Sequence, residues 1–238
     1  MFADKVAIVT GASRGIGHAL ALALAREGAT VVCTARTLDG PPERGSLKAT
    51  VQHIESAGGQ AVAIACDVGN AASVKAAVDQ TLNQFGRIDL LINNAGVFPN
   101  NNTVDTEPEE WDAAVAVNVT GPFLFCRYAL PGMIEQRNGN ILNFTSQLAN
   151  MARPGRTAYS VTKAALDRFT INLAEEVRAH GIAVNSLMPG LVATEMTGGD
   201  GDPPELVTPA ALWLLEQNAE QFTGQIVSRK EFGQGWGR

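Results

Sequence analysis

Short apolar runs rich in β-branched residues alternate along the chain with longer amphipathic segments. Most of these runs are almost continuously apolar, which is typical of strands buried on both faces of a parallel sheet. The segments between them, such as 15–29 and 71–86, have a helical pattern that closes at or near a glycine. Repeated alternation of strand and helix predicts βαβ units. The predicted strands are residues 5–10, 30–34, 61–66, 88–93, 140–145, 182–187 and 224–228.

The chain has 238 residues, which is long enough for one large α/β domain. It contains no linker-like change of composition and no internal repeat, so we expect a single domain over residues 1–238. The predicted fold is a doubly wound three-layer sandwich around a parallel sheet. Two segments rich in glycine, proline and charge, 37–48 and 196–205, are expected to be surface loops.

Composition and charge narrow the classes of function. Apolar residues make up 45% of the chain and charged residues 18%, which are ordinary globular values. A net charge of −6 offers no basic surface for nucleic acid or for an anionic membrane. No apolar run approaches the ~20 residues needed to cross a bilayer, and the start of the chain lacks the layout of a signal peptide. We therefore expect a cytoplasmic protein without a nucleic-acid or membrane partner.

Cysteines and histidines show no pattern of metal ligands. The three cysteines are scattered, which is typical of reduced thiols packed as small apolar groups. The three histidines lack the spacing of metal ligands, so no metal site is predicted. The residues concerned are Cys33, Cys66, Cys126, His18, His53 and His180.

A glycine-rich turn, "VTGASRGIG" at 9–17, follows the first predicted strand and opens the first predicted helix. Glycines at Gly11, Gly15 and Gly17 let the backbone turn tightly and let a pyrophosphate approach the amides of a helix N-terminus, whose dipole favours anions. Glycine-rich turns also occur without a ligand. The position between strand and helix nevertheless favours a dinucleotide site.

The end of the second predicted strand, "CTAR", indicates which dinucleotide binds. A carboxylate at this point would hydrogen-bond a ribose 2′-hydroxyl and select NAD. Here Ala35 is apolar and Arg36 offers a guanidinium to a 2′-phosphate, with Arg14 as a second candidate. The alternative is that both arginines are simply solvated. The charge argument favours NADP(H), with NAD(H) as the other possible coenzyme.

Two further motifs follow the third and fourth predicted strands. They are "CDV", with Asp67 and Val68, and "NNAG", residues 93–96. Ligands of open α/β sheets bind beyond the carboxyl ends of the strands, so both motifs fall where a cofactor is expected. Alternatively, Asn93 caps the strand end and Gly96 makes a turn.

The chain resembles the short-chain dehydrogenase/reductase family from about residue 3 to 228. The motifs "TGASRGIG", "CDV", "NNAG", "VNV", "YSVTK" and "MPGLVATEM" occur in the order of that family, with a serine at the end of the fifth strand. The resemblance implies a Rossmann-type fold with a seven-stranded sheet, a nicotinamide cofactor and a homo-oligomer, as tetramer or dimer. The implied catalytic tetrad is Asn118, Ser146, Tyr159 and Lys163.

The resemblance also implies a set of cofactor contacts. Asn94 would meet the ribose, Asp67 and Val68 the adenine, and Thr194 the nicotinamide amide. A short substrate loop is implied at about 195–206. The implied cofactor-binding residues are Gly11, Ser13, Arg14, Gly15, Ile16, Gly17, Arg36, Asp67, Val68, Asn94, Ala95, Gly96, Tyr159, Lys163, Pro189, Gly190, Val192 and Thr194.

The spacing of Tyr159 and Lys163 places both side chains on one face of a helix. A free tyrosine has a pKa of ~10, and an ammonium ~4 Å away would lower that pKa toward the working pH. Tyr159 would then be the general acid in reduction and the base in oxidation. Ser146 would bind the substrate oxygen and Asn118 a water, or the two would be a helix cap and a buried hydrogen-bonding residue.

These residues predict hydride transfer between NADP(H) and a ketone, an aldehyde or a secondary alcohol. The alternatives are an NAD-dependent alcohol dehydrogenase of the same family and a sensor that binds NADP without turnover. The substrate itself is not readable, and Arg153 and Arg156 would either meet an acidic group or be solvated. Candidate pocket residues are Phe98, Gln147, Leu148, Arg153, Arg156, Leu191 and Val192.

Two flanking segments carry further expectations. In the loop 37–48, Arg44 or Lys48 would either reach the 2′-phosphate or be solvated. At the carboxyl end of the chain, Trp236 would either anchor the tail against a neighbouring subunit or belong to a mobile terminus.

Overall fold

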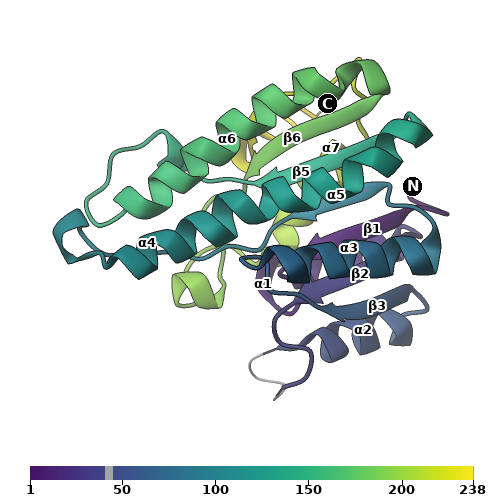
Figure 1. Ribbon diagram of the computed structural model, residues 1–238, viewed down its shortest axis with the longest axis horizontal. Helices are drawn as coiled ribbons and strands as arrows, with labels where there is room; N and C mark the ends of the chain where they lie inside the picture. The colour runs from purple at the N-terminus through teal and green to yellow at the C-terminus, as the bar shows by residue number, and fades with distance from the viewer. Residues whose placement is uncertain (41–44, 238) are drawn as a thin grey trace.

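All seven strands of the computed structural model, which describes residues 1–40 and 45–237, form one parallel sheet (Figure 1). The order across the sheet is β3-β2-β1-β4-β5-β6-β7. The predicted Rossmann-type fold is therefore confirmed. The strands are β1 (Val6–Thr10), β2 (Thr30–Ala35), β3 (Gln60–Ala65), β4 (Leu90–Asn93), β5 (Gly139–Phe144), β6 (Ile182–Met188) and β7 (Ile226–Ser228).

The chain changes direction across the sheet at β1. This strand pairs in parallel with β2 on one side and with β4 on the other, with Ile8 opposite both Val32 and Leu91. Connections on the two sides of such a switch point diverge, which opens a crevice beyond the carboxyl ends of the strands. The loops after β1 and β4 therefore border one site.

Helices cover both faces of the sheet because the strands are apolar on both faces. Successive residues of β1 alternate between the two layers: Val9 packs with one buried cluster and Ile8 with the other. The first cluster includes residues of α1 (Gly15–Arg26), α2 (Leu47–Ser56) and α7 (Thr208–Glu216). The second includes residues of α3 (Ala71–Phe85), α5 (Gly121–Gln136) and α6 (Thr157–Val177), which lie in front of the sheet in Figure 1.

Local sequence signals begin and end the helices. The side chains of Ser46 and Asn70 accept hydrogen bonds from the backbone N–H groups of Ala49 and Ser73, and so cap α2 and α3. Gly86 ends α3 in the left-handed conformation, which glycine adopts without steric cost. The predicted strands are all present, although β4 and β7 begin two residues later than the apolar runs at 88 and 224.

Residues 108–136 form one continuous helical run. It consists of α4 (Pro108–Val115), a π-helical segment (Ala116–Thr120) and α5. By length and composition alone this run could cross a membrane, which is an exception to the expectation that no apolar segment is long enough. Here α5 packs against α3, β4 and β5, and it buries Phe125 and Met133 completely. The apolar side of the run thus belongs to the core.

The C-terminal tail folds back onto its own chain. The indole N–H of Trp236 donates to the carbonyl oxygen of Ser228 at 2.9 Å, and the ring lies against Trp213, Phe222 and Phe232. The idea that Trp236 anchors the tail against a neighbouring subunit is therefore wrong for this side chain. It is also not part of a mobile end, because it is 9% exposed within one of the two buried clusters.

We expect Trp236→Ala to lower the free energy of unfolding by about 3 kcal/mol, because it leaves a cavity in the aromatic cluster. Urea unfolding followed by circular dichroism measures this loss. Trp111→Ala is the matched control, since Trp111 is 38% exposed. Equal losses for the two variants would contradict the packing described for the tail.

Candidate active site

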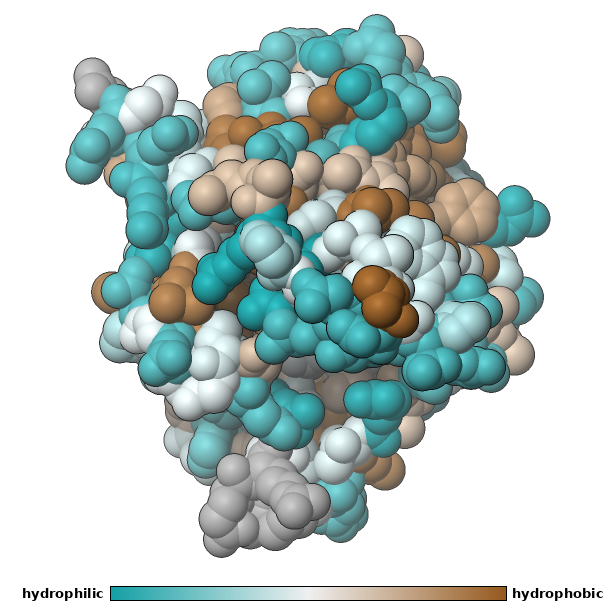
Figure 2. Space-filling view, turned by 90° about the vertical axis from the view of Figure 1, so that its left-hand side faces the viewer, coloured by the Kyte–Doolittle hydropathy of each residue, from teal (hydrophilic) through white to brown (hydrophobic). Residues whose placement is uncertain are grey.

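A cleft of about 480 Å³ lies at the carboxyl ends of the strands. Figure 2 looks toward this end of the molecule, where polar residues cover much of the surface and hydrophobic residues lie between them. The size is in the range of small-molecule sites. Predicted residues that line the cleft are Gly11, Ser13, Arg14, Gly15, Ile16, Arg36, Asp67, Val68, Asn94, Ala95, Gly96, Phe98, Tyr159, Lys163, Pro189 and Thr194.

The glycine turn is built as its sequence indicates. Gly11 and Gly15 have positive φ angles of 68° and 57°, which a side chain would strain. Gly17 is outside the described lining of the cleft. Glycine is needed there because a Cβ would stand 2.3 Å from the carbonyl oxygen of Gly11. Its role is the close packing of α1 on the turn. Helix α1 begins at Gly15 without a side-chain cap, so its first amides suit an anion.

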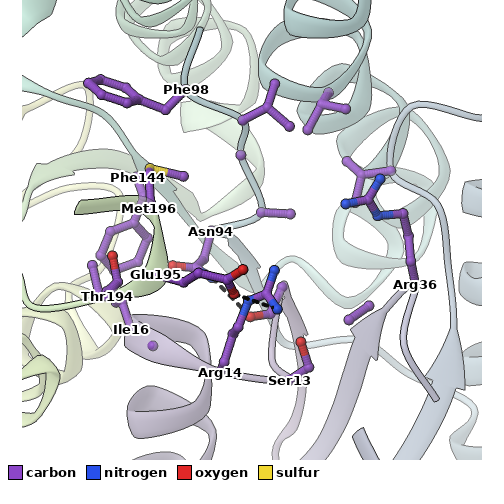
Figure 3. Close-up of a pocket in the computed structure, with 18 of the residues that line it drawn as sticks. Ser13, Arg14, Ile16, Arg36, Asn94, Phe98, Phe144, Thr194, Glu195 and Met196 are labelled. Atoms are coloured by element: carbon purple, nitrogen blue, oxygen red, sulfur yellow. Dashed lines mark hydrogen bonds and ion pairs between the residues drawn. The ribbon is translucent and has the colours of Figure 1, made fainter. Parts of the chain in front are cut away.

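Two arginines stand beside this turn. Figure 3 shows Arg14 reaching from the turn toward Glu195, and its guanidinium forms an ion pair of 2.7 Å with that carboxylate. Arg36 is exposed at the end of β2 and lines the same cleft (Figure 3). Arg14 is thus not a simply solvated arginine. Any phosphate that binds it meets Glu195 as a competitor.

The "NNAG" segment joins the ends of β1 and β4. The side-chain amide of Asn94 donates to the carbonyl oxygen of Thr10 at 2.8 Å. The backbone N–H groups of Asn94 and Ala95 donate to the Thr10 hydroxyl at 2.9 and 3.0 Å. Asn93 turns the other way and donates to the Asn143 side chain. Asn94, which is expected to meet the ribose, thus lines the cleft, and its side-chain amide nitrogen holds the turn together.

Tyr159 and Lys163 lie in the cleft on the same face of α6, and both are nearly buried. The ammonium of Lys163 is 5.6 Å from the centroid of the Tyr159 ring and donates to the carbonyl oxygen of Phe144 at 2.7 Å. The Tyr159 ring packs edge-on against Phe98, with 4.6 Å between the ring centroids. The pair is therefore set in a cleft wall rather than on a solvated helix face.

The protonation of this pair differs from the expectation that Lys163 brings the tyrosine close to neutral pH. Burial raises the pKa of Tyr159 to about 12, although the nearby Ser146 hydroxyl lowers it. Burial lowers the pKa of Lys163 to about 8, and the negative charge of Asp167 opposes that change. Loss of solvation is the largest cause of both shifts. In this structure Tyr159 is a proton donor at neutral pH.

The other two expected tetrad residues, Asn118 and Ser146, form hydrogen bonds with segments that border the cleft. Asn118, in the π-helical segment, is fully buried, and its side chain accepts from the N–H of Val97 and donates to Val97 and to the Thr162 hydroxyl. These bonds use its amide group, so it ties the loop after β4 to α6. The Ser146 hydroxyl accepts from the N–H of Leu148. Both therefore have the structural role set out as an alternative, and Ser146 also lies near Tyr159.

The loop after β6 is tied at both ends. Val192 and Asp202 form a β-bridge, and the guanidinium of Arg229 pairs with Asp202 and donates to the carbonyl oxygen of Pro189 at 2.7 Å. Between these ends, Glu195–Thr197 forms a 3₁₀ turn that starts at Thr194. The expected substrate loop is therefore a closed, compact segment, and Pro189 and Thr194 face the cleft.

Several residues that were expected to contact the cofactor or the substrate lie outside the described lining of the cleft. Lys48 pairs with Asp39 at 2.6 Å, and Arg44 lies outside the described residues. Arg156 is half-buried, with its guanidinium 4.6 Å from the centre of the Phe98 ring, whereas Arg153 is exposed. Expected residues outside the described lining of the cleft are Gly17, Asn118, Ser146, Gln147, Leu148, Arg153, Arg156, Gly190, Leu191 and Val192.

Some residues of the site were not expected from the sequence. Phe144 and Thr145 line the cleft just before Ser146; Glu195 and Met196, which belong to the expected substrate loop but were not named as site residues, line it just after Thr194. Their positions beside motif residues are the signal that could have found them. Arg229 had no such signal, because its contacts with the loop join distant parts of the chain. Among the described residues, no group of three or more His, Cys, Asp or Glu could hold a metal ion.

The chain has relatives of known name. Residues 5–204 match the family described as short chain dehydrogenase. The chain is 40% identical over 193 residues to a 3-oxoacyl-[acyl-carrier-protein] reductase of Synechocystis sp., which covers 81% of this chain and 76% of the relative. It is 38% identical over 239 residues to the reductase of that name from Staphylococcus aureus, covering 94% of this chain and 95% of the relative.

Solved structures agree with these relatives. A metagenomic short-chain oxidoreductase in complex with NADP superimposes with a TM-score of 0.84 at 34% identity, covering 95% of this chain and 97% of the other. The structure of a putative short-chain dehydrogenase/reductase from Burkholderia xenovorans gives a TM-score of 0.88 at 30% identity, covering 95% of each chain. The protein belongs to the short-chain dehydrogenase/reductase family of oxidoreductases.

Proposed function

We propose that the protein is an NADP(H)-dependent oxidoreductase that transfers hydride between the nicotinamide and a ketone, an aldehyde or the corresponding secondary alcohol. The observation that carries this proposal is the single cleft that contains both the glycine turn and the Tyr159–Lys163 pair. A binding protein without turnover would not need a buried phenol and ammonium beside the cofactor site. We further propose a cytoplasmic homo-oligomer, as family membership suggests.

The residues of the cleft fit a bound dinucleotide. The uncapped start of α1 and the turn at Gly11 and Gly15 suit the pyrophosphate, and Thr194 suits the amide of the nicotinamide. The nicotinamide supplies or accepts the hydride when it is bound. In reduction, Tyr159 donates its phenolic proton to the substrate oxygen as negative charge develops there. In oxidation, the phenolate oxygen of Tyr159 takes the proton back from the alcohol.

Lys163 and Ser146 prepare this proton transfer. The Lys163 ammonium, held by the carbonyl oxygen of Phe144, favours the phenolate that forms when Tyr159 gives up its proton. The Ser146 hydroxyl lies near the phenol and donates to the same substrate oxygen. Asn118 fixes the loop after β4 against α6 and so keeps the cleft in shape.

We expect Tyr159→Phe to lower kcat about 100-fold or more, because it removes the general acid. The assay follows NADPH absorbance over a panel of carbonyl compounds, which includes a 3-oxoacyl thioester because the named relatives act on 3-oxoacyl groups. Tyr128→Phe is the matched control at the other tyrosine of the chain. Undiminished turnover by Tyr159→Phe would overturn the mechanism. If the wild type turned over no compound of the panel, that result would favour the sensor alternative.

The preference for NADP(H) rests on charge at the end of β2. Ala35 presents no carboxylate to a 2′-phosphate, and Arg36 lines the cleft beside it. We expect Arg36→Asp to weaken NADPH binding about 10- to 100-fold, because one charge-assisted hydrogen bond contributes about 1.5–3 kcal/mol. NADH binding should change much less. Fluorescence titration with both coenzymes measures this, with Arg127→Asp on the exposed side of α5 as control. Equal losses for NADPH and NADH would count against Arg36.

The raised pKa of Tyr159 can be measured directly, because the chain has two tyrosines. In Tyr128→Phe we expect tyrosinate absorbance to rise with a pKa of about 12, two units above a free tyrosine at about 10. Since the folded pKa is the higher one, ionisation removes stability as the pH rises between these values. Circular dichroism recorded in parallel identifies the pH values at which the protein is still folded, and only absorbance at those values is used. A transition near pH 10 in folded protein would show that the phenol is not desolvated.

A further inference from the structure

Three ionisable side chains follow one another on the inner face of α6: Tyr159, Lys163 and Asp167. Their spacing of four residues places them one turn apart. All three are buried, and Asp167 is 6% exposed. The first two line the cleft, whereas Asp167 lies one turn further along the helix and belongs to no motif considered so far.

Asp167 is an anomaly among buried polar groups. Both of its carboxylate oxygens are buried and have no hydrogen-bond partner of good geometry among the described residues. The hydroxyl of Thr145, at the end of β5, is also buried without such a partner, yet it lies near enough to lower the pKa of Asp167. A buried carboxylate without hydrogen bonds is costly unless a nearby positive charge compensates for it.

Lys163 is the group that can compensate. Its ammonium is fully desolvated and makes its hydrogen bond to a neutral acceptor, the carbonyl oxygen of Phe144. Among the described residues, the groups shown to lie near it are Tyr159 and Asp167 on α6 and the carbonyl oxygen of Phe144 on β5. Of these, Asp167 alone carries a charge. Each charge raises the preference of the other for its ionised form.

Burial pushes the two protonation equilibria toward each other. The pKa of Lys163 is lowered to about 8, and the pKa of Asp167 is raised, in both cases mainly by desolvation. Without the carboxylate, the pKa of Lys163 would fall further, because its remaining neighbours are neutral. Lys163 would then lose its charge within the range of pH in which Tyr159 must act.

We propose that Asp167 is a positioning residue that supplies the buried negative charge which keeps Lys163 as an ammonium beside Tyr159. It acts through Lys163 and touches neither substrate nor cofactor. The role rests on the proposed function, since it serves the proton transfer of Tyr159. The charge relation between Asp167 and Lys163 can nevertheless be measured without any turnover.

The first test is the pH profile of carbonyl reduction. The rate falls as the pH rises through the pKa of Lys163, and we expect Asp167→Asn to move this fall toward acid by about one pH unit or more. Asp167→Glu keeps the charge and should return the fall to near its wild-type position. Glu176→Gln is the matched control, because Glu176 is exposed on the same helix. A residue that only fills space would lower kcat at every pH without moving the profile, and that result would overturn the proposal.

The second test needs no activity. The chain has five lysines, and ¹³C labelling at their Cε atoms follows each titration by NMR, with Lys163→Met identifying the signal of Lys163. We expect Lys163 to titrate near pH 8 in the wild type and at lower pH in Asp167→Asn. An unchanged titration in Asp167→Asn would overturn the proposal even if the enzyme is active.

A reciprocal measurement covers the case in which Asp167→Asn does not fold. Coupling between two sites is mutual, so Lys163→Met should raise the pKa of Asp167, followed by the ¹³C shift of its carboxyl carbon. An Asp167 carboxyl that titrates at the same pH in the wild type and in Lys163→Met would overturn the proposal. If the wild type reduces no carbonyl compound, the proposed function fails, while both NMR titrations still decide the role of Asp167.

Discussion

The cleft depends on the hydrogen bonds that join the ends of β1 and β4. These two strands are neighbours in the sheet but lie some eighty residues apart in the chain, so no short loop links their ends covalently. The hydroxyl and carbonyl oxygens of Thr10 accept three hydrogen bonds from Asn94 and Ala95. Because the sheet changes direction at this point, these bonds set the distance between the glycine turn and the loop that precedes Asn118.

Desolvation decides the electrostatics of the site. In water a phenol and an ammonium four residues apart would influence each other weakly, since solvent screens exposed pairs. On the buried face of α6, burial raises the pKa of the Tyr159 phenol and lowers the pKa of the Lys163 ammonium. Reaction charge therefore appears in a setting where it is poorly hydrated, and each fixed dipole nearby has a larger effect. Helix α6 is as much a part of the core as of the cleft.

Much of this arrangement could be predicted from the sequence. Continuous apolar runs predict buried parallel strands, and the positions of Gly11 and Gly15 predict the turn, because these signals depend on residues close together in the chain. The side-chain partners of Asn118 could not be predicted, since Val97 and Thr162 reach it only after folding. The direction of the pKa shift of Tyr159 also required the structure, because spacing reveals the neighbouring charge but not the loss of water around the phenol.

The ion pair and hydrogen bond of Arg229 link the far end of the chain to the mouth of the cleft. Arg229 follows β7 and starts the segment that Trp236 fastens to α7, while its guanidinium contacts Pro189 and Asp202 at the two ends of the loop after β6. The position of the tail is thereby coupled to the shape of this loop. A change that displaced Trp236 from its packing against α7 would therefore also loosen the loop beside the cleft, at a distance from the substituted residue.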